Sequence, residues 1–448
     1  MNEFNRNLPL SSSAPVGEIL LAETAVRIEL PPSLHRLAVE RYEALRKYIE
    51  RDSSPLAGRV RIFYPQGSMA IKATIRSRKR EDGFDIDIVA ELILASTTAP
   101  AAVLYLLFTA LNGEKGSLYH GKVERNTRCV TVHYEDGMHL DITPSILIDE
   151  RDPRRSMIFH AKAEQPEATH RRLEMNSYAF VDWFNARTPI DLSFVEAYAK
   201  KAYAFDHRSI RADAEVKPVP AHSTTDGGKS ATVVAQQLLK CNRNLKYVRR
   251  PGRMPPSVMI ATFSGETAVP GNSISGALDA ITDLMLTSLS AAQAQGRLID
   301  VRNPCCPADR FTDRWPENLA AQATYIDDLK LFRQQLAALM SEGLSLEDKR
   351  KLLALMFGEG PARAVVEDFS ARLGESVRQG TRRIATTGRV VPATVAAAAV
   401  TRPAVAQPRG HTFYGVRWTV ESRCGAVAVG QTYLLPPLSS GGALVVCP

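Results

Sequence analysis

Apolar residues recur at two different spacings along this chain. Between residues 31 and 51 the spacing is three or four, which predicts an amphipathic helix beginning at Pro31-Pro32. Its apolar positions are Leu34, Leu37, Ala38, Tyr42, Leu45 and Ile49. Between residues 84 and 92 the spacing is two, which predicts a strand. Its apolar face carries Phe84, Ile86 and Ile88, and its polar face carries Asp85 and Asp87.

Shorter segments make the first part of the chain a mixture of helices and strands. Alternation and turn residues predict strands at Arg59–Tyr64, Cys129–Tyr134 and His139–Ile142. The last two are separated by Glu135-Asp136-Gly137, so they predict a hairpin. Two further helical segments are expected, one or two turns at Met69–Ala73 and a helix at Ala101–Leu111.

Beyond about residue 170 the pattern becomes helical, with few β-branched runs. The segments with helical spacing are Arg171–Ala186, Ser193–Phe205, Ala231–Tyr247, Pro256–Phe263, Ile274–Gln295, Trp315–Ser341 and Ser345–Gly358. A mixed lobe followed by a helical lobe predicts an α+β fold.

The 448 residues exceed what one hydrophobic core usually organises, so we expect several parts. We predict a flexible N-terminus over residues 1–30, a sheet-containing lobe over 31–205 and a helical lobe over 206–375. A basic linker rich in Ala, Val, Thr, Arg and Pro follows over 376–410. Residues 411–448 form a short C-terminal segment, too short for an independent core.

The net charge of +8 is concentrated near the C-terminus. Seven arginines and no Asp or Glu lie between Ser376 and Val420, which leaves a charge of about +1 for the rest of the chain. A basic tail can bind polyanions weakly. A nearly neutral body argues against a dedicated DNA-binding face.

Targeting and metal-binding patterns are also informative. The longest apolar runs, at 100–111 and 390–400, are shorter than the roughly 20 residues of a membrane span. The N-terminal residues do not have the pattern of a signal peptide, so we expect a cytoplasmic protein without membrane contact. The six cysteines form no C-x-x-C pair, which predicts reduced thiols and no structural zinc.

Three carboxylates are the candidates for chemistry. Asp85 and Asp87 share one strand face, so both can reach one divalent cation or bridge two, and carboxylate oxygens suit Mg²⁺ or Mn²⁺. An isolated D-x-D can also be the solvated face of an amphipathic strand, but two adjacent carboxylates repel and favour a cation. Asp141 lies between Leu140 and Ile142, in the phase that can meet the other two acids across a strand pair.

A phosphate-binding turn is the fourth candidate. Gly67-Ser68 lies where a strand passes into a helix, so backbone amides and a hydroxyl can face an anion there, although the same turn is also an ordinary helix cap. By contrast, Gly227-Gly228-Lys229-Ser230 lacks the leading glycine of a P-loop, since position 223 is Ser, and is interpreted as a loop capping the helix at Ala231. His133 and His139 flank the hairpin without further zinc ligands, which predicts surface or site-lining residues.

Together these motifs resemble the active-site signature of cGAS/DncV-like nucleotidyltransferases, the CD-NTases, within the polymerase-β-like superfamily. The resemblance rests on Pro65–Ser68, Thr74–Arg76, Phe84–Val89 and Leu140–Pro144. It continues in the helical lobe through Gln236–Lys240, Pro255–Met259 and Phe311–Trp315, and covers about residues 30–360. It implies that residues 31–205 are the nucleotidyltransferase catalytic lobe and that 411–448 are an incomplete sensor domain.

The resemblance implies a role for each site residue. Asp85, Asp87 and Asp141 are expected to hold two Mg²⁺ or Mn²⁺ ions and to be catalytic. The turn of Gln66, Gly67 and Ser68 is expected to hold the donor triphosphate. Lys240 and Ser257 are expected to reach the phosphates from the helical lobe, although Lys240 also fits a solvated helix cation.

The implied function is synthesis of cyclic di- or trinucleotide second messengers from nucleoside triphosphates, with release of pyrophosphate, in antiphage defence. The resemblance also allows an activating protein partner. An alternative is a template-independent nucleotidyltransferase acting on an RNA end or a protein hydroxyl. A third is a non-catalytic nucleic-acid-binding protein that uses the basic tail, against which the intact carboxylates argue.

Overall fold

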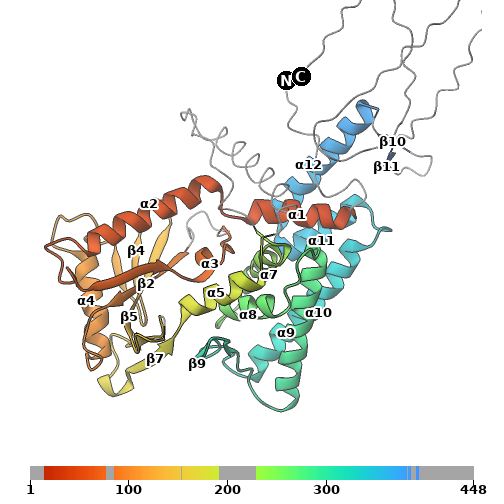
Figure 1. The fold of residues 1–448 in the computed structure, drawn as a ribbon. Helices are drawn as coiled ribbons and strands as arrows, with labels where there is room; N and C mark the ends of the chain where they lie inside the picture. Colours follow the sequence, from red (N-terminus) through yellow and green to blue (C-terminus); the bar gives the residue numbers. More distant parts are fainter. Residues whose placement is uncertain are drawn as a thin grey trace, which may run out of the picture. The chain divides into compact units, whose positions relative to one another are not determined.

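The computed structural model of the chain describes residues 15–76, 85–152, 154–190, 229–380, 382–384 and 390–392, and every statement below concerns these residues (Figure 1). They belong to one compact unit that ends at Pro392. The start of the strand expected at Phe84, the helix expected at Ser193–Phe205, and residues 411–448 lie outside them.

A seven-stranded mixed sheet forms the first lobe, with the order β1-β2-β5-β4-β3 and with β6 pairing both β5 and β7. The strands are β1 (Val60–Pro65), β2 (Asp85–Leu92), β3 (Val123–Arg125), β4 (Val130–His133), β5 (His139–Leu147), β6 (Ser156–His160) and β7 (Arg171–Met175). The pairing of β2 with β5 is parallel, and the other pairs are antiparallel. The expected strands and the hairpin of β4 and β5 are confirmed.

The two faces of this sheet differ as the alternation in β2 predicts. Ile86, Ile88 and Leu92 are buried in a hydrophobic core with residues of α2 (Pro32–Ile49) and α4 (Pro100–Asn112). Asp85, Asp87 and Glu91 alternate with them along the strand and therefore point to the opposite face. The apolar core thus fixes which side of the sheet is polar.

The second lobe is helical, as expected. It contains α7 (Ala231–Tyr247), α8 (Ser257–Glu266), α9 (Ile274–Ala294), α10 (Leu319–Met340), α11 (Leu346–Phe357) and α12 (Glu359–Arg378). A small hairpin of β8 (Arg302–Asn303) and β9 (Cys306–Arg310) follows α9, and α5 (Ser177–Arg187) follows β7. No helix in the described part of the chain has both the length and the apolarity that a membrane span requires.

The N-terminal segment differs from the expected flexible residues 1–30. Residues Val16–Ile28 form helix α1, which packs into the core of the helical lobe beside α12 and α7 (Figure 1). Its carboxylate Glu18 is 5% exposed and accepts hydrogen bonds from the backbone amides of Ile274 (2.5 Å) and Ser275 (3.1 Å) at the start of α9. The sequence did not reveal this helix because its partners lie about 250 residues away.

Two further expectations need correction. The segment expected to be helical at 171–186 begins with β7, an edge strand that pairs β6, and becomes helical only at Ser177. Helix α12 continues to Arg378, and a hairpin of β10 (Arg382–Ile384) and β11 (Val390–Pro392) follows, so the predicted linker over 376–410 starts with ordered structure. Short edge strands and pairings between distant segments leave little periodicity in a sequence.

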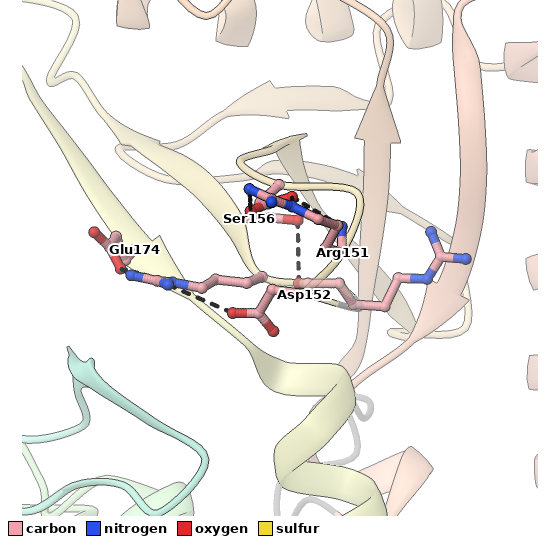
Figure 2. A network of polar contacts seen from close by, with 7 residues as sticks. Arg151, Asp152, Ser156 and Glu174 are labelled. Carbon is pink, nitrogen blue, oxygen red and sulfur yellow. Dashed lines mark hydrogen bonds and ion pairs between the residues drawn. The ribbon is translucent and has the colours of Figure 1, made fainter.

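The connection between β5 and β6 is held by ion pairs. Arg155 donates to Glu174 on β7 through Nε (3.1 Å) and Nη2 (2.7 Å), and to Asp152 through Nη1 (3.4 Å). Figure 2 shows Asp152 and Glu174 joined to one guanidinium between them. Arg154 donates to the fully buried Glu91 of β2 (3.1 Å). These contacts tie the outer strands to the central one.

The Glu18 contacts give a test of the role of α1. Glu18→Ala leaves two amides at the start of α9 without their acceptor, so we expect the free energy of unfolding to fall by about 2–4 kcal/mol. Urea unfolding followed by far-ultraviolet circular dichroism measures the change. Glu40→Ala, at an exposed position of α2, should change it by less than about 0.5 kcal/mol. Equal effects of the two substitutions would contradict this role.

Candidate active site

The parallel pairing of β2 with β5 brings the predicted acids together. Asp87 and Asp141 are direct partners in the register, and Asp85 is the partner of His139. Partners on adjacent strands point to the same face, so the three acids share the polar face of the sheet. Thr131 of β4 donates a hydrogen bond to Oδ1 of Asp141, and Nε2 of His139 lies 2.5 Å from Oδ1 of Asp85.

The electrostatics of this face favour a bound cation. Burial raises the pKa of Asp87 to about 7, with further increases from the charges of Asp141 and Asp85 and a partial offset from Lys240. Among the described residues, no three His, Cys, Asp or Glu side chains lie close enough together to hold a metal ion. The Asp85 carboxylate instead contacts His139. The oxygen donors nevertheless fit Mg²⁺ or Mn²⁺, because a divalent cation offsets both the burial and the neighbouring negative charges that raise the pKa of Asp87.

The turn before the short helix α3 (Gly67–Ala70) lies directly against Asp87. The amide of Gln66 donates to the carbonyl of Asp87 (2.8 Å). Gly67 has a φ of +59°, and a Cβ there would come within 2.3 Å of Oδ2 of Asp87. The hydroxyl of Ser68 accepts a weak hydrogen bond from Thr74 (3.4 Å). Glycine at 67 is therefore required both by backbone conformation and by the close approach of the carboxylate.

Helix α7 of the helical lobe is joined to the segment that follows this turn. Nζ of Lys240 donates to the carbonyl of Ala73 (2.8 Å), and Nε2 of Gln237 donates to the carbonyl of Thr74 (2.8 Å). Burial lowers the pKa of Lys240 to about 7, with a contribution from Arg243 and a partial offset from Asp87 and Asp85. Lys240 is thus a buried residue near the carboxylates and not a solvated cation on the helix surface.

These elements enclose a cavity of about 920 Å³. Of the predicted site residues, the ones that line it are Gln66, Gly67, Ser68, Asp85, Asp87, Lys240 and Ser257. Asp141 is not among the lining residues and lies beside Asp87 in the sheet. Ser257, at the start of α8, accepts a hydrogen bond from Nη1 of Arg243 (3.0 Å). The volume is within the range of ordinary ligand sites.

Some residues of the site were not predicted from the sequence. His133 and His139 line the cavity, as the expectation of surface or site-lining residues allowed, but the direct contact of His139 with Asp85 was not predicted. Thr131 was missed, although its position between two valines on β4 could have indicated the polar face. Arg128 and Asp309 also line the cavity, and no local pattern points to them.

A parallel strand pair carrying three acids, a Gly-Ser turn against one of them and a facing helical lobe are together the features of the polymerase-β-like nucleotidyltransferase fold. Residues 62–144 match the family model described as "Cyclic GMP-AMP synthase DncV-like, nucleotidyltransferase domain". This stretch contains the turn and all three acids.

Comparison over the whole chain is more extensive. The chain is 41% identical over 406 residues to the cyclic dinucleotide synthase CdnG of Bradyrhizobium diazoefficiens, covering 89% of this chain and 95% of that protein. It is 23% identical over 349 residues to a c-di-GMP synthase of Roseivirga ehrenbergii, covering 77% and 85% of the two chains. The solved structure of B. diazoefficiens CdnG in complex with GTP matches with a TM-score of 0.69 and 40% identity, covering 80% of this chain and 99% of that one.

This chain therefore belongs to the CD-NTase family. It is a nucleotidyltransferase and synthesises a cyclic oligonucleotide. The structure of CdnC bound to a HORMA protein from E. coli MS115-1 has the same fold. It matches with a TM-score of 0.52 and 16% identity, covering 78% of this chain and 98% of that one.

The contact between Gly67 and Asp87 gives a test of the site geometry. Gly67→Ala should displace the Asp87 carboxylate, so we expect the rate of pyrophosphate release to fall by about 100-fold or more. Gly58→Ala is the matched control, because Gly58 has a similar φ of +67° but nothing within 4 Å of the added Cβ. Both variants carry about 1–2 kcal/mol of backbone strain. Equal activity in the two variants would show that the contact does not matter.

Proposed function

We propose that this chain condenses nucleoside triphosphates, GTP among them, into a cyclic dinucleotide with release of pyrophosphate. The observation that carries the proposal is the alignment of Asp87 with Asp141 across the β2–β5 pair, with Asp85 nearby, beside the cavity. The presence of GTP in the structure of the 40% identical CdnG supports GTP as a substrate.

In this proposal the three acids are the catalytic and metal-binding residues. Asp85, Asp87 and Asp141 would hold two Mg²⁺ or Mn²⁺ ions. When bound, such ions polarise the attacking hydroxyl and neutralise the pyrophosphate that leaves. Thr131 keeps the Asp141 carboxylate oriented through its hydrogen bond, and His139 does the same for Asp85.

The donor triphosphate would lie between the turn and the helical lobe. Gln66, Gly67 and Ser68 of the sheet lobe and Lys240 and Ser257 of the helical lobe all line the cavity. Arg243, which donates to Ser257, lines it as well, so the helical lobe brings basic side chains to it. Binding there would hold the α-phosphate beside the acids and exclude water from it.

The setting of this activity is proposed from the family. We infer a cytoplasmic enzyme whose product is a second messenger in antiphage defence. Whether it needs an activating protein partner is tested by assaying the purified chain alone.

The two alternatives from the sequence have less support. Transfer to an RNA end needs phosphate contacts, which a body with a net charge of about +1 provides poorly. Transfer to a protein hydroxyl has no specific observation in its favour. Non-catalytic binding of nucleic acid would rest on the basic segment alone.

The role of Asp87 can be tested by substitution. Asp87→Asn removes a charge without changing shape, so we expect turnover to fall by about 1000-fold or more. Without metal, the stability should be unchanged or higher, because the buried charge and its repulsion are removed. The assay incubates the protein with all four nucleoside triphosphates and Mg²⁺ or Mn²⁺, removes unreacted nucleotides with phosphatase and identifies products by mass spectrometry.

The control for this experiment is Asp327→Asn, which removes an equal charge at an exposed position of α10. It should retain wild-type turnover. Near wild-type turnover in the Asp87 variant would remove the metal assignment.

The basic segment gives a separate prediction. Truncation after Pro392, where the compact unit ends, should leave turnover within about 3-fold of the full chain, since all proposed site residues precede it. Nucleic-acid binding that disappears on truncation, together with no turnover in the full chain, would favour the non-catalytic alternative instead.

A further inference from the structure

One wall of the cavity carries a carboxylate that the proposed chemistry does not use. Asp309, in strand β9, accepts hydrogen bonds from Nδ2 of Asn303 (3.0 Å) and from the backbone amide of Asn176 (3.3 Å). Both donors bind the same oxygen, Oδ2. Among the described residues Oδ1 has no donor, although Asp309 lines the cavity. The side chain is thus fixed by one oxygen while the other remains free to accept.

The support for Asp309 is itself rigid. Asn303 is 1% exposed, and its Nδ2 also donates to the carbonyl of Asn176 (2.9 Å). Asn176 caps helix α5 by accepting from the amide of Ala179 (2.9 Å). Strand β8 and the residue before α5 therefore hold the carboxylate of β9 in place at the cavity wall.

An arginine lines the same cavity as this carboxylate. Burial raises the pKa of Asp309, while Arg128 and Asp313 lie near enough to act on it with opposite signs. Arg128 also lines the cavity; its Nε donates to Nδ1 of His160 (3.0 Å), and its guanidinium forms an ion pair with Asp313. Arg128 comes just before β4, whose Thr131 pairs with Asp141 and donates to its carboxylate, so Arg128 lies on the Asp141 side of the acids.

Apolar side chains line the same cavity. Phe311, two residues after Asp309, lines the cavity and packs edge-on against Phe180, with ring centroids 5.1 Å apart. Met175 and Ile158 line the cavity as well. Flat aromatic and apolar side chains beside a few fixed polar groups are the usual environment of a bound nucleobase.

We propose that Asp309 and Arg128 form a guanine-recognition subsite for the nucleotide that lies on the Asp141 side of the acids. The proposal rests on the function proposed above. Guanine places the N1–H and 2-amino donors next to the O6 acceptor along one edge, which matches a carboxylate next to an arginine. Adenine places an acceptor at N1 and a donor at N6. The carboxylate would then face an acceptor, and the arginine would face a donor.

The first experiment compares GTP with inosine triphosphate, whose base differs only by lacking the 2-amino group. Steady-state kcat/KM for each nucleotide alone is measured by pyrophosphate release. The affinity for each nucleotide is measured by calorimetry, so that the preference can also be determined for an inactive variant. The wild-type protein should prefer GTP by about 10-fold. In Asp309→Asn the preference should fall below about 2-fold, because the amide offers a poorer acceptor at this position.

Asp182→Asn is the matched control. Asp182 is exposed on α5, near Cys305 of the β8–β9 hairpin that carries Asp309, and it does not line the cavity. It should keep the wild-type preference. A wild-type protein that treats the two nucleotides alike, or an Asp309 variant with an unchanged preference, would overturn the proposal. So would an equal change in the control.

The second experiment tests Arg128 independently of Asp309. Arg128→Gln should lower kcat/KM for GTP by about 10-fold or more. The same substitution should change kcat/KM little for 2-aminopurine riboside triphosphate, whose base lacks O6, and also N1–H, in wild type and variant alike. An equal loss with both nucleotides would contradict recognition of O6 by Arg128. Absence of any cyclic product from the wild-type protein would instead contradict the proposed function, so the two failures are distinguishable.

Discussion

Repulsion between like charges on one sheet face is the constraint on which this structure depends. Asp87 is partly buried beside Asp141 and Asp85, where each negative charge makes the next one less favourable. The apolar neighbours Ile86, Leu140 and Ile142 are almost completely buried on the opposite face. A slip of one residue in either strand would expose these side chains and bury the acids, so the hydrophobic core enforces a register that electrostatics alone would oppose.

The two lobes are joined at the segment that follows the Gly-Ser turn. Its carbonyl groups at Ala73 and Thr74 accept hydrogen bonds from α7, and Ile75 forms a bridge with Glu29, just after α1. Glu29 in turn forms an ion pair with Lys229, directly before α7. The Gly-Ser turn, and through it Asp87, is thus positioned by the same short stretch of backbone that binds the helical lobe, which makes the position of that lobe part of the site geometry.

Local patterns in the sequence were sufficient for much of the fold and for the acidic face. A period of two in β2 and in β5 placed Asp85, Asp87 and Asp141 on the correct side, and the helical spacing of the second lobe was also confirmed. Ser230, interpreted as part of a capping loop, does accept from the amide of Val233 and caps α7. These features depend on neighbours within a few residues, so the sequence displays them directly.

Features that depend on distant partners could not be predicted in this way. Glu18 of α1 is buried because it binds amides at the start of α9, and the contact of Lys240 with Ala73 spans the two lobes. Asp309 lies in a five-residue strand without a clear alternation, and only its place in the cavity wall indicates a function. Such residues become visible when their partners are known.

The place of α1 has a consequence for the order in which the protein can form. In the sequence, the strands and helices of the first lobe come after α1 and before the other helices of the core to which α1 belongs. During synthesis, α1 leaves the ribosome before these strands and helices, but its partners at Ile274 and Asp368 follow roughly 250 and 340 residues later. The sheet lobe can therefore assemble while Leu20 and Leu21 still lack their packing partners, and completion of the helical lobe must wait until α9 and α12 have been synthesised.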